Sequence, residues 1–388
     1  MTDVQAYQKA KQLLYDCSTA HGFIAAKKQK KGNYNRIWAR DSMICSLSAF
    51  MSDDKKLIHT AKQSLLTLLC HQHEQGEIPS NVDPKKKKIS FGGTSGRVDA
   101  QLWFLIGFGQ YVKKTQDVAF AKKYFEQFKK TIQLVRIYEF NHKSLIYVPQ
   151  SGDWADEYIQ EGYVLYDQLL YYQAFTEYAY LQKLLGISNT ETNQKSKRIK
   201  ETIQINYWPV KKNVPKSFHR NLYEQYIDKK KPYLLAFFHP GEYGLHFDLF
   251  ANSLALLLNI TTPHQKKQIT AFVKKSFDLP PCFSPTITKR NSLYKKLELN
   301  FGHSFRNYPH HYHNGGIWPM ILGFYISAQP DEALFEKLTT LVSEPNWEFN
   351  EVYHGKTHEP HGTPLQAWSG AGVIFAYQSL KNKRKVFL

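Results

Sequence analysis

Cysteine is scarce in this sequence, and long apolar runs are absent. The four cysteines are Cys17, Cys45, Cys70 and Cys282, and no two of them form a CxxC pair. Cys45 and Cys70 fall in apolar helical contexts, so the pattern predicts buried free thiols in a reducing compartment. No stretch reaches the roughly eighteen consecutive apolar residues of a membrane span, and the N-terminus lacks the apolar core of a signal peptide. We therefore expect a cytoplasmic protein with no membrane partner.

Acidic residues are also few. The chain has 33 Asp and Glu against 51 Lys and Arg, which gives a net charge of +18 and an isoelectric point near 9.4. Clustered basic residues can bind nucleic acid because they release counterions from phosphates. Here most lysines are scattered along amphipathic segments or form short runs at 85–88 and 229–231, with no nucleic-acid-binding motif beside them. The composition favours a solvated basic surface, and we do not expect nucleic acid as the main partner.

What the sequence does have is helical periodicity. Ala121, Phe125, Phe128, Ile132 and Val135 are spaced four, three, four and three residues apart, which places them on one face of a helix. The same rhythm recurs along 165–179. Comparable segments cover 3–17, 40–51, 55–71, 99–114, 248–259, 264–275, 315–327, 331–342 and 366–380. The pattern predicts an all-α fold.

About a dozen helices of this kind suit a closed toroid of helical hairpins, with loops of the inner helices gathered at one end. The stretches 188–232 and 279–312 are the longest candidates for irregular structure. Neither resembles a Gly/Ser linker, so we expect one domain over residues 1–388.

Polar residues and tryptophans meet at the ends of the apolar helices. They occur in "NRIWARDSMI", "SGRVDAQLWF", "SGDWADEY", "YHNGGIWP", and "NWEFNEVYHG" followed by "PLQAWSGAG". Taken singly, Asp41 and Asp99 are explained as helix caps or first-turn acids, the tryptophans as core, and the acids near 153 as a solvated loop. Together the clusters indicate a sugar site, because indole rings stack on the C–H face of a pyranose while Asp, Asn, Arg and His bind its hydroxyls.

Histidines 310, 311 and 313 raise the question of a metal site. No HExxH pattern accompanies them, and neighbouring histidines in a loop cannot all turn the same way. We expect no metal and no organic cofactor. Hydrolysis of a glycoside instead needs two carboxyl groups, one protonated and one ionised. The clusters supply candidates for both.

These motifs resemble the (α/α)6-barrel glycosidases, in particular the amylo-α-1,6-glucosidase catalytic domain of glycogen-debranching enzymes and the neutral/alkaline invertases. The similarity runs in order from about residue 34 to 380. It is carried by "IWARDSMI", "VDAQLWFLIGFGQY", "DWADEY" with "YDQLLYYQAF", "FDLFANSLALLLNI", "YHNGGIWPMILG", "NEVYHG" and "HGTPLQAWSGAG". The resemblance implies an (α/α)6 toroid and an inverting mechanism without a cofactor, with carboxyl groups roughly 6.5–9.5 Å apart.

The resemblance also implies roles for individual residues. The general acid corresponds to Asp156, with Asp153 as the alternative, and the base corresponds to Glu351, with Glu348 as the alternative. We expect Asp156 to be kept neutral by apolar walls such as Trp154 or by repulsion from neighbouring acids. The residues implied in substrate binding are Trp38, Arg40, Asp41, Asp99, Trp154, His313, Asn314, Trp318, Gln366 and Trp368.

The flanking domains of many relatives are not found in this sequence, so an α-glucoside or short oligosaccharide is expected as substrate rather than a long branched polymer. Sucrose is the first alternative within the same fold. A sugar 2-epimerase is the second, with the histidines from His303 to His313 as its proton carriers. A non-catalytic sugar-binding protein with a basic docking surface is the third. The oligomeric state stays open.

Overall fold

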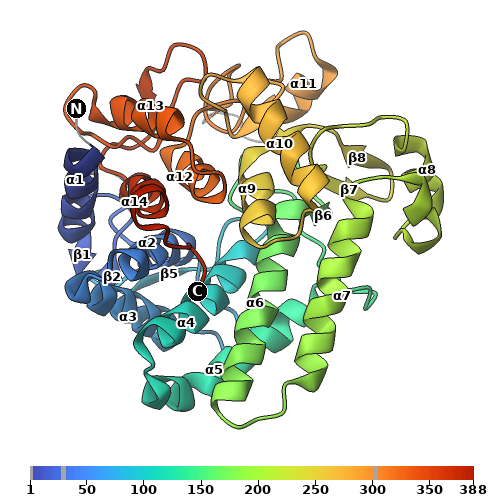
Figure 1. Ribbon diagram of the computed structural model, residues 1–388. Helices are drawn as coiled ribbons and strands as arrows, with labels where there is room; N and C mark the ends of the chain where they lie inside the picture. Colours follow the sequence, from blue (N-terminus) through green and yellow to red (C-terminus); the bar gives the residue numbers. More distant parts are fainter. Residues whose placement is uncertain (1–2, 28–31, 300–304) are drawn as a thin grey trace.

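Two concentric layers of helices make up the fold (Figure 1). The computed structural model describes residues 3–27, 32–299 and 305–388. The outer helices are α1 (Asp3–Asp16), α3 (Lys55–Cys70), α5 (Val118–Ile137), α7 (Thr190–Asn206), α10 (Pro263–Ser276) and α13 (Glu332–Ser343). The inner helices are α2 (Ala39–Ser52), α4 (Val98–Thr115), α6 (Leu165–Leu184), α9 (Leu249–Leu257), α12 (Pro319–Ala328) and α14 (Ala367–Asn382). Outer and inner helices alternate along the chain, so the predicted (α/α)6 toroid is confirmed.

The inner helices form a closed ring. Each contacts the next in the order α2, α4, α6, α9, α12, α14, and α14 returns to α2. Because neighbours surround them, α2 and α4 are buried along nearly their whole length, whereas α5 buries one stripe that includes Phe120, Phe128 and Val135. Despite this apolar ring, none of the described helices is long and apolar enough to cross a membrane.

The two ends of the ring differ. At the end where the inner helices finish, the backbone N–H of Leu388 donates to the Gln110 side chain near the end of α4, at 2.8 Å. At the other end the inner helices begin, and short strands hold the chain just before α2, α6 and α9. These strands are β3 (Ile37–Trp38), β6 (Tyr163–Val164) and β9 (Phe247–Asp248), paired with β4 (Asn81–Asp83), β7 (Phe237–His239) and β10 (Phe283–Ser284). The ladders therefore fix how the chain enters the inner helices.

The remaining strands are short hairpin pieces. β5 (Lys88–Ser90) extends the β3–β4 pair, and β8 (Glu242–Gly244) extends the β6–β7 pair. β1 (Ser18–Thr19) pairs with β2 (Gly22–Phe23), and β11 (Val352–Tyr353) pairs with β12 (Pro360–His361). The β11–β12 hairpin directly follows Glu351, the residue expected to be the base.

The expectation of irregular structure over 188–232 and 279–312 is wrong in part. The first stretch contains α7, a 3-10 helix (Lys211–Lys216) and α8 (Arg220–Tyr226), and the second contains α11 (Ser292–Leu299). In α7 the buried positions keep helical spacing but are largely polar, namely Thr192, Ser196, Ile199, Ile203 and Asn206. With two apolar residues in that stripe, the sequence did not show the apolar repeat that predicts a helix. His303 lies outside the described residues.

The expectation of buried thiols holds for three cysteines and fails for one. Cys17, Cys45 and Cys282 are buried, whereas Cys70 is exposed. Cys70 is the last residue of α3, where the chain turns away from the apolar face of the helix. Its sequence context was apolar, but its position at the helix end decides its exposure.

Two glycines allow α12 and α14 to approach closely. A Cβ atom at Gly323 would overlap the carbonyl oxygen of Gly372, and one at Gly372 would overlap the carbonyl oxygen of Pro319. Because these obstacles are backbone atoms, they cannot be removed by a change of rotamer.

We therefore expect Gly323→Ala to reduce the free energy of unfolding by ~1–3 kcal/mol, the usual effect of overpacking. Gly93→Ala is the control, because a Cβ atom there meets no heavy atom within 4 Å. Urea unfolding followed by circular dichroism measures both variants. Equal stability of the two would contradict a backbone contact between α12 and α14.

Candidate active site

Side chains from the first turns of the inner helices bond to one another at the open end of the ring. Arg40 of α2 pairs with Asp99 of α4, with 2.7 Å between Nη1 and Oδ2. The Tyr166 hydroxyl of α6 donates to the same Asp99 oxygen at 3.2 Å. Gln366, which precedes α14, donates through Nε2 to Asp41 Oδ1 at 3.1 Å. These bonds bring four of the six helix N-termini to one place.

Three tryptophans form an aromatic floor beneath these polar groups. Trp318 lies edge to face with both Trp154 and Trp368, at centroid distances of 5.5 and 5.8 Å. All three are nearly fully buried. The guanidinium of Arg40 lies 5.7 Å from the Trp368 ring centre. The His313 ring stacks on Trp318 at 5.4 Å, and burial lowers its pKa well below the usual value, so the imidazole is neutral.

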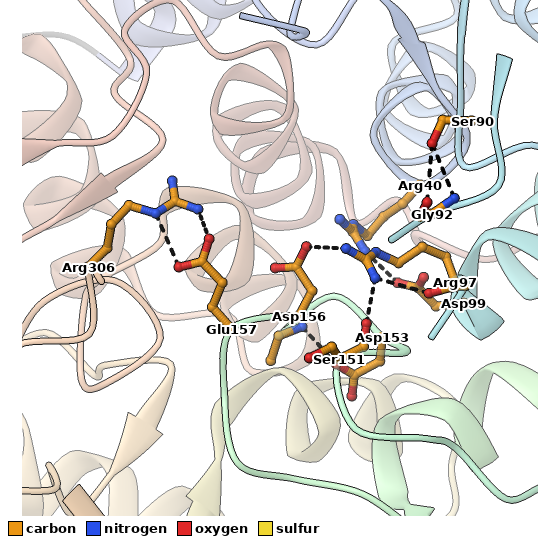
Figure 2. Close-up of polar contacts among 12 residues, drawn as sticks. Arg40, Ser90, Gly92, Arg97, Asp99, Ser151, Asp153, Asp156, Glu157 and Arg306 are labelled. Carbon is orange, nitrogen blue, oxygen red and sulfur yellow. Dashed lines mark hydrogen bonds and ion pairs between the residues drawn. The ribbon is translucent and has the colours of Figure 1, made fainter. Parts of the chain in front are cut away.

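Asp156 pairs with one arginine and lies beside a second acid–arginine pair (Figure 2). Its Oδ2 is 2.6 Å from Arg97 Nη2, and a quarter of its side chain is exposed. On the other side, Glu157 pairs with Arg306. The carboxylate of Asp156 thus has an arginine partner, and two other acids, Glu157 and Glu351, lie within electrostatic reach of it. Its expected role as the acid stays a prediction.

Asp153, in contrast, is buried. It is 2 % exposed, and its two oxygens accept from the Ala155 N–H and from Gln160 Nε2, each at 2.8 Å. Burial, with a contribution from Asp99, raises the pKa of Asp153 to about 7. Because both oxygens hold the 153–160 loop together, Asp153 is placed to position that loop.

Glu351 is buried and has two donors. The Tyr34 hydroxyl donates to Oε1 at 2.7 Å, and the Thr363 N–H donates to Oε2 at 3.2 Å. Burial raises the pKa of Glu351, the Tyr34 hydrogen bond and Arg306 lower it, and the charge of Asp156 raises it again. Asp156 and Glu351 therefore lie within electrostatic reach of each other. Glu348 is half-buried, and its charge acts on Tyr353.

The segment after residue 304 ties these loops together. Arg306 lies over the Tyr312 ring at 3.9 Å and pairs with Glu157, while Asn307 Nδ2 donates to the Glu157 carbonyl at 2.6 Å. Asn314 in turn donates to the carbonyls of Ile287 and Asn307, at 2.8 and 3.0 Å. Asn314 thus bonds backbone groups through its side chain, and its role in substrate binding stays a prediction.

Trp38, the remaining predicted residue, is half-buried at the entrance to α2. Its indole N–H donates to the Asn33 carbonyl at 3.0 Å, and its ring lies 6.3 Å from that of Tyr34. Several buried side-chain atoms at this end have no hydrogen-bond partner within the described part of the chain. They are Arg40 Nε, Arg97 Nε, Asp99 Oδ1, Trp154 Nε1, His313 Nδ1, Gln366 Oε1 and Trp368 Nε1.

A second group of acids lies deeper, at the starts of α6 and α9. Asp167 is fully buried, and neither of its oxygens has a hydrogen-bond partner among the described residues. Burial, then the charges of Asp153 and Asp99, raise its pKa well above the usual value. Asp248 caps α9 by accepting from the Ala251 N–H at 2.9 Å, and burial raises its pKa to about 7.

Sequence reasoning missed Tyr34, Arg97, Tyr166, Asp167 and Arg306 as members of the site. Tyr34 directly precedes the recognised motif "NRIWARD", and Arg97 lies inside "SGRVDAQLWF", so the motifs themselves were an available signal. Tyr166 and Asp167 lie at the start of α6, inside the recognised segment "YDQLLYYQAF". Arg306 has no local signal, because only the fold brings it to Glu157.

The histidines form a cluster at the β11–β12 hairpin. The rings of His311, His354 and His361 lie with centroids 4.6–6.0 Å apart. The His354 Nδ1 accepts from the Thr357 N–H at 2.9 Å. Across residues 3–27, 32–299 and 305–388, no three His, Cys, Asp or Glu side chains are arranged to hold a metal ion.

An (α/α)6 toroid with carboxylates and tryptophans gathered where its inner helices begin has the architecture of the six-hairpin glycosidases. The family comparison agrees, because the model described as amylo-alpha-1,6-glucosidase matches residues 25–375. The chain belongs to this family.

Sequence relatives are distant. The chain is 23% identical over 440 residues to the probable alkaline/neutral invertase A, chloroplastic, of Arabidopsis thaliana, covering 94% of this chain and 68% of that protein. It is 22% identical to the mitochondrial alkaline/neutral invertase C of the same plant, covering 92% of this chain and 63% of that protein. The chain thus spans about two thirds of the length of these invertases.

Solved structures share the fold. A bacterial glucoamylase complexed with acarbose superposes with a TM-score of 0.69 at 13% identity, covering 99% of this chain and 56% of that one. The GH63 mannosylglycerate hydrolase of Thermus thermophilus superposes with a TM-score of 0.65 at 13% identity, covering 95% of this chain and 99% of that one. At such identities the similarity establishes the fold alone.

The raised pKa of Asp167 makes stability depend on pH. Between about pH 4, where an unfolded aspartate loses its proton, and the higher pKa of the folded state, the folded chain holds a proton that the unfolded chain has released. The free energy of unfolding therefore falls as pH rises. Asp167→Asn removes the ionisation, so we expect a Tm above wild type at pH 8, on the order of 2 °C, and a smaller difference at pH 5.

Thermal unfolding of both proteins at pH 5 and pH 8 measures this effect. Asp228→Asn is the control, because Asp228 is exposed. A loss of stability in Asp167→Asn of the same size at both pH values would show that Asp167 is ionised in the folded protein.

Proposed function

We propose that this protein is an inverting glycoside hydrolase that cleaves an α-glucoside or short oligosaccharide, of the debranching α-1,6-glucosidase type. One observation carries the proposal. Asp156 and Glu351, 195 positions apart in the sequence, lie within electrostatic reach at the open end of the ring and have different environments. Two carboxyl groups with separate roles are what glycoside hydrolysis requires.

Glu351 is assigned as the base. The Tyr34 hydroxyl and the Thr363 N–H both donate to it, and donors of this kind favour the ionised form. An ionised Glu351 removes a proton from water as the water attacks the anomeric carbon. The same bonds fix the direction of the carboxylate, so the water has one defined position.

Asp156 is assigned as the acid that protonates the leaving oxygen. Arg97 holds its Oδ2, which leaves Oδ1 for the glycosidic oxygen. Asp156 also lies within electrostatic reach of Glu157 and Glu351. Asp153 is engaged by its own loop at both oxygens, so it supports Asp156 rather than replacing it.

The sugar at the cleavage point is assigned to the groups around α2 and α14. Arg40, fixed by Asp99, and Asp41, held by Gln366, offer a donor and an acceptor side by side. The unpartnered indole and imidazole nitrogens of Trp154, Trp368 and His313 supply further polar contacts. The half-buried Trp38 offers an aromatic face for stacking.

Sucrose is the second candidate substrate, because the curated relatives are named as invertases. Cleavage of sucrose would use the same acid and base, with fructose as the leaving group. The two proposed activities, α-glucoside hydrolysis and sucrose hydrolysis, therefore differ in substrate and share one mechanism.

We expect Asp156→Asn and Glu351→Gln each to lower kcat on the order of 10²–10⁴-fold, the usual contribution of a general acid or base. Glu348→Gln is the matched control, since it changes the same side chain three residues away and should retain activity. The assay is a hydrolysis screen with isomaltose, panose, maltose, kojibiose, trehalose and sucrose, with the released anomer followed by NMR.

Release of β-glucose from an α-glucoside supports inversion. Release of the α-anomer contradicts it. A loss of activity in Glu348→Gln with full activity in Glu351→Gln would move the base to Glu348. If wild type and variants bind sugar equally well and none of them hydrolyses any of the six sugars, the protein is a sugar-binding protein instead.

The Tyr34 hydrogen bond lowers the pKa of Glu351, so its removal raises that pKa. Because the base must be ionised, the low-pH limb of kcat/KM should move to higher pH in Tyr34→Phe, by roughly half to one pH unit for a single hydrogen bond. Tyr226→Phe, on α8, is the control. A shift to lower pH would contradict the assignment of Glu351 as the base.

A further inference from the structure

A groove runs between the outer helices α5 and α7, away from the candidate active site. It has a volume of about 1370 Å³, and α6 forms its floor through Phe175, Tyr178 and Gln182. In Figure 1, α6 lies between α5 and α7. None of the residues assigned to the acid, the base or sugar binding lines it. It exceeds the ~300–1,000 Å³ of common small-molecule sites.

The groove is lined by cations from four separate segments. Arg136 comes from the end of α5, Lys143 from the loop that follows, and Lys195 and Arg198 from α7, with Lys216 opposite. Its acidic residues are Glu139 and Glu191. Five cations against two acids concentrate part of the +18 net charge of the chain in one concave place.

One acid is already neutralised. Glu139 is 2 % exposed and pairs with Lys195, and it also accepts from the Tyr171 hydroxyl at 2.6 Å and from the Ser144 N–H at 3.3 Å. Lys195 donates further to Ser144 Oγ at 3.1 Å. This buried network fixes Lys195 at the base of the groove.

The two arginines of the groove differ from Lys195. Within the described residues, neither Arg136 nor Arg198 forms an ion pair. Burial lowers the pKa of Lys195, Glu139 opposes this, and the nearby Arg198 and Arg136 lower it further. Three cations therefore repel one another here, and an anion between them would relieve that repulsion.

We propose that the groove between α5 and α7 binds a small phosphate-bearing anion, held by Arg136, Lys195 and Arg198. Guanidinium groups match the geometry of phosphate oxygens and can bind them through two parallel hydrogen bonds. The hydroxyl and amide groups of Ser217, Thr202 and Gln194 line the same groove and suit a polar body such as a sugar. The proposal does not depend on the assigned reaction.

The test measures binding by isothermal titration calorimetry with inorganic phosphate, pyrophosphate and glucose 6-phosphate, against sulfate at equal ionic strength. We expect glucose 6-phosphate or pyrophosphate to bind, and Arg136→Gln with Arg198→Gln to raise Kd at least tenfold. Lys122→Gln with Lys123→Gln is the matched control, because it removes two charges of α5 outside the groove. Thermal unfolding confirms that both double variants fold.

A preference for glucose 6-phosphate assigns a sugar phosphate, and a preference for pyrophosphate assigns a bare phosphate chain. Both results support the site. Equal binding of sulfate and phosphates, or equal weakening in the two double variants, overturns it in favour of a general basic surface. Tight, salt-dependent binding of an oligonucleotide with no binding of the small phosphates also overturns it.

Discussion

Closure of the inner ring is the constraint on which the site depends. Six helices that contact one another in a circle and begin at the same end bring together loops that are hundreds of residues apart. The positive ends of their dipoles then converge, which favours acidic side chains in the first turns. Asp41, Asp99 and Asp167 occupy those turns in α2, α4 and α6. The fold thus creates an acidic centre in a basic protein.

The carboxyl groups at this end of the ring differ in their contacts. Asp156 and Glu351 have donors and lie within reach of each other, which suits proton transfer. Burial raises the pKa values of Asp153, Asp167 and Asp248, and it also raises that of Glu351. Asp153 holds the 153–160 loop and Asp248 caps α9, whereas Asp167 has no hydrogen-bond partner among the described residues.

The arginines of this basic protein have different partners in different places. Around the candidate active site each arginine has an acidic partner, as in the pairs Arg40–Asp99, Arg97–Asp156 and Arg306–Glu157. In the groove between α5 and α7 two arginines have no such partner within the described residues. The same residue type therefore orients carboxylates at one place and remains available for a ligand at another.

The sequence by itself determined the helices whose apolar faces repeat at helical spacing, the motifs at their ends, and through these the toroid and its family. It did not determine α7, whose buried stripe is mostly polar. Nor did it show that Arg97 would pair with Asp156, that Asp153 would be the more buried of the two acids, or that Arg306 would reach Glu157. Local periodicity reports burial along one helix, whereas ion pairs and shared electrostatics depend on distances that only ring closure sets.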